Sequence, residues 1–122
     1  MGLISSGSSL NLPTGSGSER LCRAVLQGNN NAKTEILSGT AGHIYTILSI
    51  ICAEQQGATC TIQIHVDNGT NETRLLSAKV IGAYDTFVWN DRFVLEEDDD
   101  LDVQNTTTDC DWYVSYIDQD WT

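Results

Sequence analysis

Five acidic residues follow one another at positions 96–100, inside the stretch VLEEDDDLDV, and they are the first residues that suggest chemistry. Carboxylates bind Ca²⁺, and a pair of them performs acid and base catalysis in glycosidases. An EF-hand loop needs oxygen ligands at alternating positions and a glycine at its turn, and EEDDDLD has neither. A glycosidase pair needs one carboxylate whose pKa is raised by burial, which a solvated cluster does not provide. We therefore interpret the run as a solvated turn between two strands, whose charges also protect a sheet edge from unwanted pairing.

A weak calcium site is the alternative for these acidic residues. Neighbouring residues of an extended chain project to opposite sides, so their carboxylates converge on one ion only at a tight turn. Such a turn would bring Asp98 and Asp100 together with Asp102, or with Asp109 and Asp111 from the next loop. This alternative stays open, and the sequence indicates no other metal site and no cofactor.

Two histidines and four cysteines are the other candidates for catalysis or metal binding. His43 lies beside a predicted turn and His65 on the polar face of a predicted strand, and neither accompanies a nucleophile motif such as G-x-S-x-G. The cysteines show no C-x-x-C spacing and no paired histidines, which argues against structural zinc and favours reduced, buried thiols. They are Cys22, Cys52, Cys60 and Cys110. We identify no catalytic residue and expect a protein that is not an enzyme.

The charge balance narrows the range of partners. Lys and Arg total 6 and Asp and Glu total 17, so the formal net charge is -11. A chain this acidic repels phosphate backbones and anionic lipid, which argues against nucleic acid and membrane surfaces as partners. Its 122 residues fit one domain. No apolar stretch has the length of a membrane-spanning helix and the N-terminus lacks the features of a secretory signal, so we expect a soluble protein.

From residue 19 onward, short β-prone runs alternate with turn residues, and no window shows an apolar stripe at helical spacing. Short strands that recur every 8 to 12 residues or so are typical of sandwiches and barrels. We therefore predict an all-β fold, with residues 19–122 forming a single antiparallel β-sandwich of the jelly-roll-like type. The expected strands are residues 20–27, 33–37, 43–53, 59–67, 73–80, 86–89, 92–95, 101–105 and 112–117.

The strands at 43–53 and 59–67 are predicted to form a hairpin centred on Gln56. Its register places Cys52 opposite Cys60 on an apolar inner face, so a disulfide between them is geometrically possible, although reduced thiols remain the expectation. Large apolar side chains on the other face of the first strand would then point outward. These are Tyr45, Ile47 and Ile51. Either another strand of the domain or a partner subunit is expected to cover them.

Residues 1–18 read as an extended N-terminal arm. The segment MGLISSGSSLNLPTGSGS is rich in Gly and Ser, uncharged, and without helical or strand periodicity. Alone it cannot bury enough surface to offset the entropy lost on ordering. We expect it to become ordered on a neighbouring protein, with packing on its own domain as the alternative. Its candidate anchors are Leu3, Ile4, Leu10 and Leu12.

Two stretches carry a resemblance to a known group of proteins. TEILSGTAGHIYTILSIICAEQQGATCTIQIHVDN, followed by LLSAKVIGAYDTFVWNDRFVLEEDDDLDVQNTTTDCDWYVSYIDQ, resembles the small β-sandwich virion proteins of tailed bacteriophages. The similarity covers residues 33–119 as a pattern of runs and turns. The usual turns of that group contain glycine where this chain has GAYD and EEDDD. The resemblance transfers no active site.

What the resemblance implies is a virion structural protein without enzymatic activity. The first expectation is a capsid decoration or cement protein that stabilises the shell by lacing its arm over neighbouring subunits. Its partners would be the major capsid protein or other virion proteins, together with further copies of itself in a homo-oligomer. The alternative is a tail, neck or fibre subunit that binds a carbohydrate or receptor, with Trp89, Tyr84 or Trp121 as a stacking platform and a calcium ion at residues 98–102.

Overall fold

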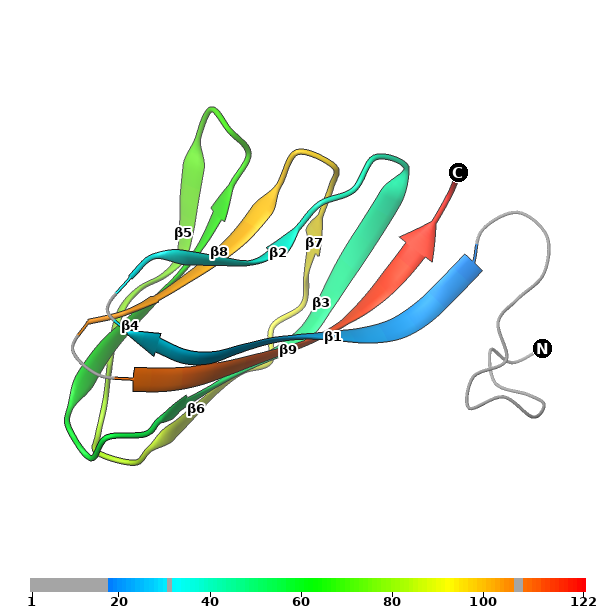
Figure 1. Ribbon diagram of the computed structural model, residues 1–122. Helices are drawn as coiled ribbons and strands as arrows, with labels where there is room; N and C mark the ends of the chain where they lie inside the picture. The colour runs from blue at the N-terminus through cyan, green and yellow to red at the C-terminus, as the bar shows by residue number, and fades with distance from the viewer. Residues whose placement is uncertain (1–17, 31, 107–108) are drawn as a thin grey trace, which may run out of the picture.

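The computed structural model describes residues 18–122 except residues 31 and 107–108 (Figure 1). Within these ranges the chain forms nine β-strands and no helix, hence none that is long and apolar enough to span a membrane. The predicted all-β fold is therefore confirmed, whereas the predicted arm lies outside the described residues except for Ser18. The strands are β1 (Ser18–Asn30), β2 (Thr34–Ser38), β3 (His43–Glu54), β4 (Cys60–Asp67), β5 (Glu72–Ile81), β6 (Thr86–Trp89), β7 (Phe93–Leu95), β8 (Asp100–Asn105) and β9 (Asp109–Asp120).

The strands form two antiparallel sheets that face each other as a sandwich (Figure 1). One sheet has the strand order β1-β9-β3-β6, with β7 also paired to β3, and the other has the order β2-β8-β4-β5. Successive strands such as β1 and β2, or β8 and β9, thus lie in opposite sheets. With β6 and β7 taken as two parts of one strand, this is the order of an eight-stranded jelly roll. The predicted jelly-roll-like sandwich is confirmed.

A polar network near one end of the core joins the two sheets. Trp112 is completely buried, and its indole Nε1 donates a hydrogen bond of 3.1 Å to Oδ1 of Asn105. Nδ2 of Asn29 donates to the same oxygen at 2.8 Å, and Nδ2 of Asn105 donates to the carbonyl oxygen of Asn29 at 2.9 Å. These bonds connect β1, β8 and β9, and they satisfy polar groups whose burial would otherwise cost stability. Fully buried apolar side chains fill the rest of the core: Ile47, Ile50, Ile62, Ile64, Leu95, Leu101, Val103 and Val114.

Three residues of β3 were predicted to face outward, and for two of them the prediction was wrong because β3 contains a β-bulge. β3 has one extra residue, Leu48, between Ile47 and Ser49 relative to its partner β9. The extra residue reverses which side of the sheet the earlier part of the strand faces. Tyr45 and Ile47 therefore point into the core and are only 8% and 0% exposed. Of the predicted interface residues, Ile51 alone lies on the outer face.

The hairpin predicted for β3 and β4 is not formed. β3 pairs with β9, β6 and β7, whereas β4 pairs with β5 and β8, so residues 55–59 cross between the sheets. The apolar faces of the two strands pack toward each other across the core and do not join in one sheet. Cys60 therefore lies beside Cys110, with 3.9 Å between the Sγ atoms, and not opposite Cys52. The prediction failed because alternation shows which side chains point inward but not which strand is the neighbour.

The four cysteines are free thiols in this structure, and three of them are buried in the core. Burial raises the pKa of Cys52 to about 12 and raises that of Cys110 as well, which keeps both thiols protonated. A protonated thiol is neither a nucleophile nor a metal ligand. These cysteines therefore serve as small apolar packing groups.

Candidate functional site

The outer face of the β1-β9-β3-β6 sheet carries two rows of side chains that are apolar except for one threonine, and we call this surface the apolar face. The strand registers align one residue from each strand in each row. The first row is Val25, Tyr113, Ile51 and Val88, and the second is Leu21, Ile117, Thr46 and Val94. Five of the eight side chains are exposed by 37% to 60% of their area. Exposed apolar side chains that adjoin one another in this way indicate an interaction surface.

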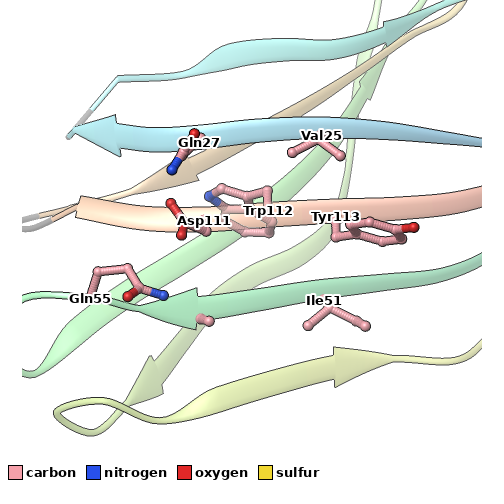
Figure 2. Close-up of a pocket in the computed structure, with 8 residues that line it drawn as sticks. Val25, Gln27, Ile51, Gln55, Asp111, Trp112 and Tyr113 are labelled. Carbon is pink, nitrogen blue, oxygen red and sulfur yellow. The ribbon is translucent and has the colours of Figure 1, made fainter.

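Two shallow hollows lie on the apolar face, and Tyr113 lines both of them. Figure 2 shows the first hollow, where Val25, Tyr113 and Ile51 lie on three neighbouring strands. Polar side chains follow further along these strands and include Gln27 and Asp111. An apolar floor with polar groups at one end suits a peptide segment that brings a few apolar anchors.

A polar row separates the two apolar rows, since Arg23 pairs with Ser115 and Ser115 pairs with Ser49. The guanidinium group of Arg23 lies 5.9 Å from the centre of the Tyr113 ring, close enough for a cation–π contact. The outer face of the other sheet is different, because β4 presents Gln63, His65 and Asp67 there. The apolar face and this polar face of β4 therefore belong to opposite sheets.

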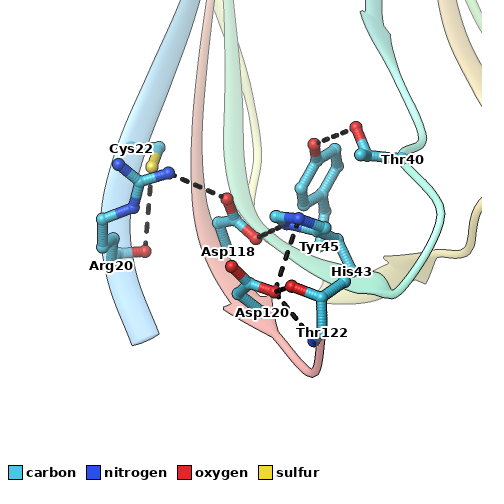
Figure 3. Close-up of polar contacts among 8 residues, drawn as sticks. All are labelled: Arg20, Cys22, Thr40, His43, Tyr45, Asp118, Asp120 and Thr122. Carbon is cyan, nitrogen blue, oxygen red and sulfur yellow. Dashed lines mark hydrogen bonds and ion pairs between the residues drawn. The ribbon is translucent and has the colours of Figure 1, made fainter. Parts of the chain in front are cut away.

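A polar cluster fixes the point where the predicted arm joins β1 (Figure 3). Nη2 of Arg20 donates to Oδ2 of Asp118 at 3.3 Å, and Nδ1 of His43 lies 2.7 Å from Oδ1 of the same carboxylate. Nε2 of His43 lies 3.6 Å from Oδ1 of Asp120. Hydrogen bonds from Thr122 hold the pKa of Asp120 below its usual value. Both imidazole nitrogens thus face carboxylates, so neither is placed to take a proton from a nucleophile. The contacts of the cluster connect β1, β9 and β3.

The acidic run forms a solvated turn between β7 and β8, as predicted. Oδ2 of Asp99 accepts a hydrogen bond of 2.9 Å from the amide of Glu96, and the amide of Asp99 donates to the Glu96 carbonyl at 3.0 Å. The amide of Gly39 donates to the Asp99 carbonyl at 2.7 Å, which ties the turn to the β2–β3 loop. Asp98 is exposed.

The calcium site that the sequence left open as an alternative is not assembled in the part of the chain that the structure describes. Asp102 lies on the outer face of the β2-β8-β4-β5 sheet, where its Oδ2 is 3.8 Å from Nζ of Lys33. Asp100 is the first residue of β8. Asp109 and Asp111 lie at the start of β9, which follows the last residue of β8. Among the described residues, neither combination considered for calcium brings three ligand atoms within 4.8 Å of one another, so the structure gives this alternative no support.

The three aromatic residues considered as alternatives for a stacking platform do not form a common surface, and whether one of them binds a sugar stays a prediction. The amide of Tyr84 donates to Glu54 at the end of β3, whereas the amide of Trp121 donates to Gly42 before the start of that strand. Trp89 is half-buried, and its Nε1 donates to the carbonyl of Asp91 at 2.8 Å. The exposed Tyr84 and Trp121 therefore lie at opposite ends of the sandwich.

Several residues of the apolar face were missed from the sequence. The run LCRAVL at 21–26 has apolar side chains on both of its faces, since Leu21 and Val25 alternate with Cys22, Ala24 and Leu26. A strand with two apolar faces is typically covered on both sides, and this signal was available for Leu21 and Val25. The predicted anchors Leu3, Ile4, Leu10 and Leu12 lie outside the described residues and remain predictions.

Comparisons with known proteins establish the fold and nothing finer. No family model matches the chain, and no curated protein matches its sequence. One similar solved structure comes from the work titled "Bacillus endospore appendages form a novel family of disulfide-linked pili", with a TM-score of 0.52, 12% identity, and coverage of 98% of both chains. Another is the Eiger TNF of S. frugiperda, with a TM-score of 0.36, 13% identity, and coverage of 84% of this chain and 92% of the other. The resemblance to phage virion proteins is thus confirmed only as a small all-β fold.

Proposed function

We propose that this chain is a structural subunit of a protein assembly and has no enzymatic activity. The observation that carries the proposal is the apolar face, which no described residue of the chain covers. Exposed rows of Val, Leu and Tyr side chains lower solubility unless a partner buries them, and burial of such surface is the main driving force of association. An acidic molecule with one apolar face associates through that face and repels its neighbours elsewhere.

The occupant of the apolar face is the N-terminal arm of a neighbouring copy. Residues 1–17 carry no charge, and their apolar side chains come in two close groups, Leu3 with Ile4 and Leu10 with Leu12. The arm leads into Ser18, the first residue of β1, which is an edge strand of the same sheet. Fully extended, 17 residues reach about 55 Å, whereas the 13 residues of β1 span about 43 Å. The arm is therefore long enough to pass beyond its own sheet and reach a second subunit.

The finer assignment that we propose is a decoration or cement protein of a tailed-phage capsid, located in the virion. The pattern of runs and turns at residues 33–119 supports it, and so does the jelly-roll order, which is used by viral capsid domains among others. The net charge of -11 suits a domain that projects into solvent and prevents particles from adhering. The similarity in fold to a subunit of pili is compatible with a role in assembly. Repetition over many sites would strengthen a modest contact between single subunits.

Matched substitutions test association through the apolar face. Val25 and Val80 are both exposed valines, 53% and 61% respectively, but Val80 lies on β5 of the other sheet. Sedimentation velocity of the full chain is expected to show oligomers that Val25→Lys abolishes and Val80→Lys preserves. A chain that is monomeric at every accessible concentration, or that oligomerises equally in both variants, would refute the proposal.

Purified particles test the capsid assignment separately. Phage shells from the source of the chain are expected to carry it in many copies, and shells stripped of it are expected to rebind the full chain but not residues 18–122 alone. If the chain is found only at the tail, or is absent from the particles, the decoration role is wrong, although the structural role of the apolar face would stand.

A further inference from the structure

A cluster of three carboxylates lies on the outer face of the β2-β8-β4-β5 sheet, away from the apolar face. One oxygen from each of Asp67, Glu72 and Asp102 lies within 4.8 Å of the other two. The strand registers explain the cluster, since Asp67 on β4 pairs with Glu72 on β5, and Asp102 on β8 pairs with His65 on β4. Three neighbouring strands thus bring their acidic side chains to one point.

His65 supplies an independent observation at this point. It is 2% exposed, although it lies on the outer face of β4. Its Nε2 lies 3.0 Å from Oε1 of Gln63, an oxygen that accepts a hydrogen bond from that nitrogen. Its Nδ1 lies 3.2 Å from Oε1 of Glu72, in a geometry that makes no hydrogen bond, and among the described residues it is the buried side-chain atom without a hydrogen-bond partner.

The protonation state of His65 makes Nδ1 an electron-pair donor. Oε1 of Gln63 can only accept a hydrogen bond, so Nε2 is the ring nitrogen that carries the proton. A neutral imidazole carries one N–H, and here Gln63 accepts it. The lone pair of Nδ1 consequently faces a carboxylate oxygen, and a cation between the two atoms would relieve this contact. Histidines that bind metals have this same arrangement, with the second ring nitrogen donating to an oxygen.

Lys33 shows that the cluster attracts a cation. Its ammonium group contacts the carboxylate of Glu72 and lies 3.8 Å from Oδ2 of Asp102. Arg74, which pairs with His65 across β4 and β5, is the second cationic residue here, so two positive charges face three carboxylates. Burial raises the pKa of Asp102, Lys33 opposes this rise, and the neighbouring charges of Asp100 and Asp67 add to it.

We propose that Asp67, Glu72 and Asp102 bind a divalent transition-metal ion that displaces the ammonium group of Lys33, and that His65, whose Nδ1 adjoins Glu72, turns toward the ion and becomes its fourth ligand. One imidazole and several carboxylates are the ligand set of ions such as Mn²⁺ and Zn²⁺, whereas Ca²⁺ takes oxygen ligands only. The separation of 3.2 Å between Nδ1 of His65 and Oε1 of Glu72 is that of adjacent ligands around a metal with bonds of about 2.1 Å. The ion would join β4, β5 and β8, and so brace the sheet opposite the apolar face.

Mn²⁺ is the suitable probe, because the free thiols of the chain compete little for it. Isothermal titration of the full chain with MnCl₂ is expected to show one site per chain. Lys33→Met removes the competing ammonium group and should tighten binding by about tenfold. Glu72→Gln should weaken binding by about tenfold or more. Glu97→Gln, which removes an exposed carboxylate of the acidic turn, is the matched control and should bind as the wild type does.

Spectroscopy locates the bound ion. Mn²⁺ is paramagnetic, so the amide signals of Gln63, His65 and Asp102 should broaden first in a proton–nitrogen spectrum, while those of the acidic turn remain sharp. Absence of saturable binding up to about 1 mM in both the wild type and Lys33→Met would overturn the proposal. Equal loss of binding in Glu97→Gln, or broadening centred on residues 96–100, would also overturn it, since the acidic turn would then be the site.

Discussion

At the scale of single residues, a buried carboxylate organises one end of the sandwich. Glu54 is 2% exposed, and its two oxygens accept hydrogen bonds from the amides of Gln56 at 2.8 Å, Gly57 at 2.7 Å and Tyr84 at 2.9 Å. The residue thereby connects the β3–β4 crossing to the β5–β6 loop. A carboxylate that accepts several amide hydrogen bonds contributes more than a neutral acceptor does.

Glu54→Gln keeps the size of the side chain but turns one acceptor oxygen into an NH₂ donor that faces backbone amides. We expect the free energy of unfolding to fall by about 2 kcal/mol, as measured by urea denaturation. Glu97→Gln makes the same chemical change in the exposed turn and should change stability by less than about 0.5 kcal/mol. Equal effects of the two substitutions would show that the amide hydrogen bonds of Glu54 contribute nothing.

The buried imidazole of His65 predicts a dependence of stability on pH. Its pKa is lowered in the folded chain, so the unfolded chain binds a proton between that lowered value and the ordinary 6.5, where the folded chain does not. Its contribution is complete above pH 6.5 and is lost as the pH falls through the folded pKa. Asp102, whose pKa is raised, titrates with the opposite sign, so the comparison must be made between variants.

Urea denaturation with a chelator present, at about pH 7.5 and about pH 5, should show a larger loss of stability for the wild type than for His65→Gln. The substitution removes the titrating group but keeps a polar side chain of similar reach. A loss of equal size in both proteins would mean that the imidazole is accessible to protons in the folded state.

At the scale of elements, the positions of the strands could be predicted from the sequence, but the register in which they pair could not. Each predicted run overlaps one observed strand, because alternation of apolar residues reflects burial of one face of a strand. The bulge at Leu48 was not predictable, since one extra residue leaves no signal in composition yet turns Tyr45 and Ile47 inward. The cluster of Asp67, Glu72 and Asp102 was also missed, because it depends on long-range pairing of three strands.

The β2–β3 loop approaches the acidic turn so closely at Gly39 that only glycine fits there. A Cβ atom at Gly39 would lie 2.0 Å from the carbonyl oxygen of Glu96, so any side chain there displaces the turn. We expect Gly39→Ala to lower the free energy of unfolding by about 3 kcal/mol. Gly69→Ala, where φ is +90° but nothing lies within 4 Å, should cost only about 1 to 2 kcal/mol from backbone strain. Thermal unfolding of both variants tests the order, and a larger loss in Gly69→Ala would contradict this explanation.

At the scale of the whole molecule, charge and apolar surface oppose each other in assembly. Copies with a net charge of -11 repel one another, while the apolar face of each attracts a partner. Added NaCl screens the repulsion, since the Debye length falls to about 3 Å at 1 M salt, and leaves apolar burial intact. The dissociation constant measured by analytical ultracentrifugation should therefore decrease as NaCl is added. A dissociation constant that increases with salt would indicate association through ion pairs, which is contrary to this account.

In the proposed assembly, the arm of one copy lies on the apolar face of another. A photo-crosslinking amino acid at position 25, in an unlabelled chain, can be mixed with ¹⁵N-labelled chains that lack it. After irradiation, mass spectrometry is expected to find position 25 joined to ¹⁵N-labelled peptides from residues 1–17. Cross-links only to unlabelled peptides of residues 1–17, or none to this segment, would show that the arm of a neighbour does not occupy the face.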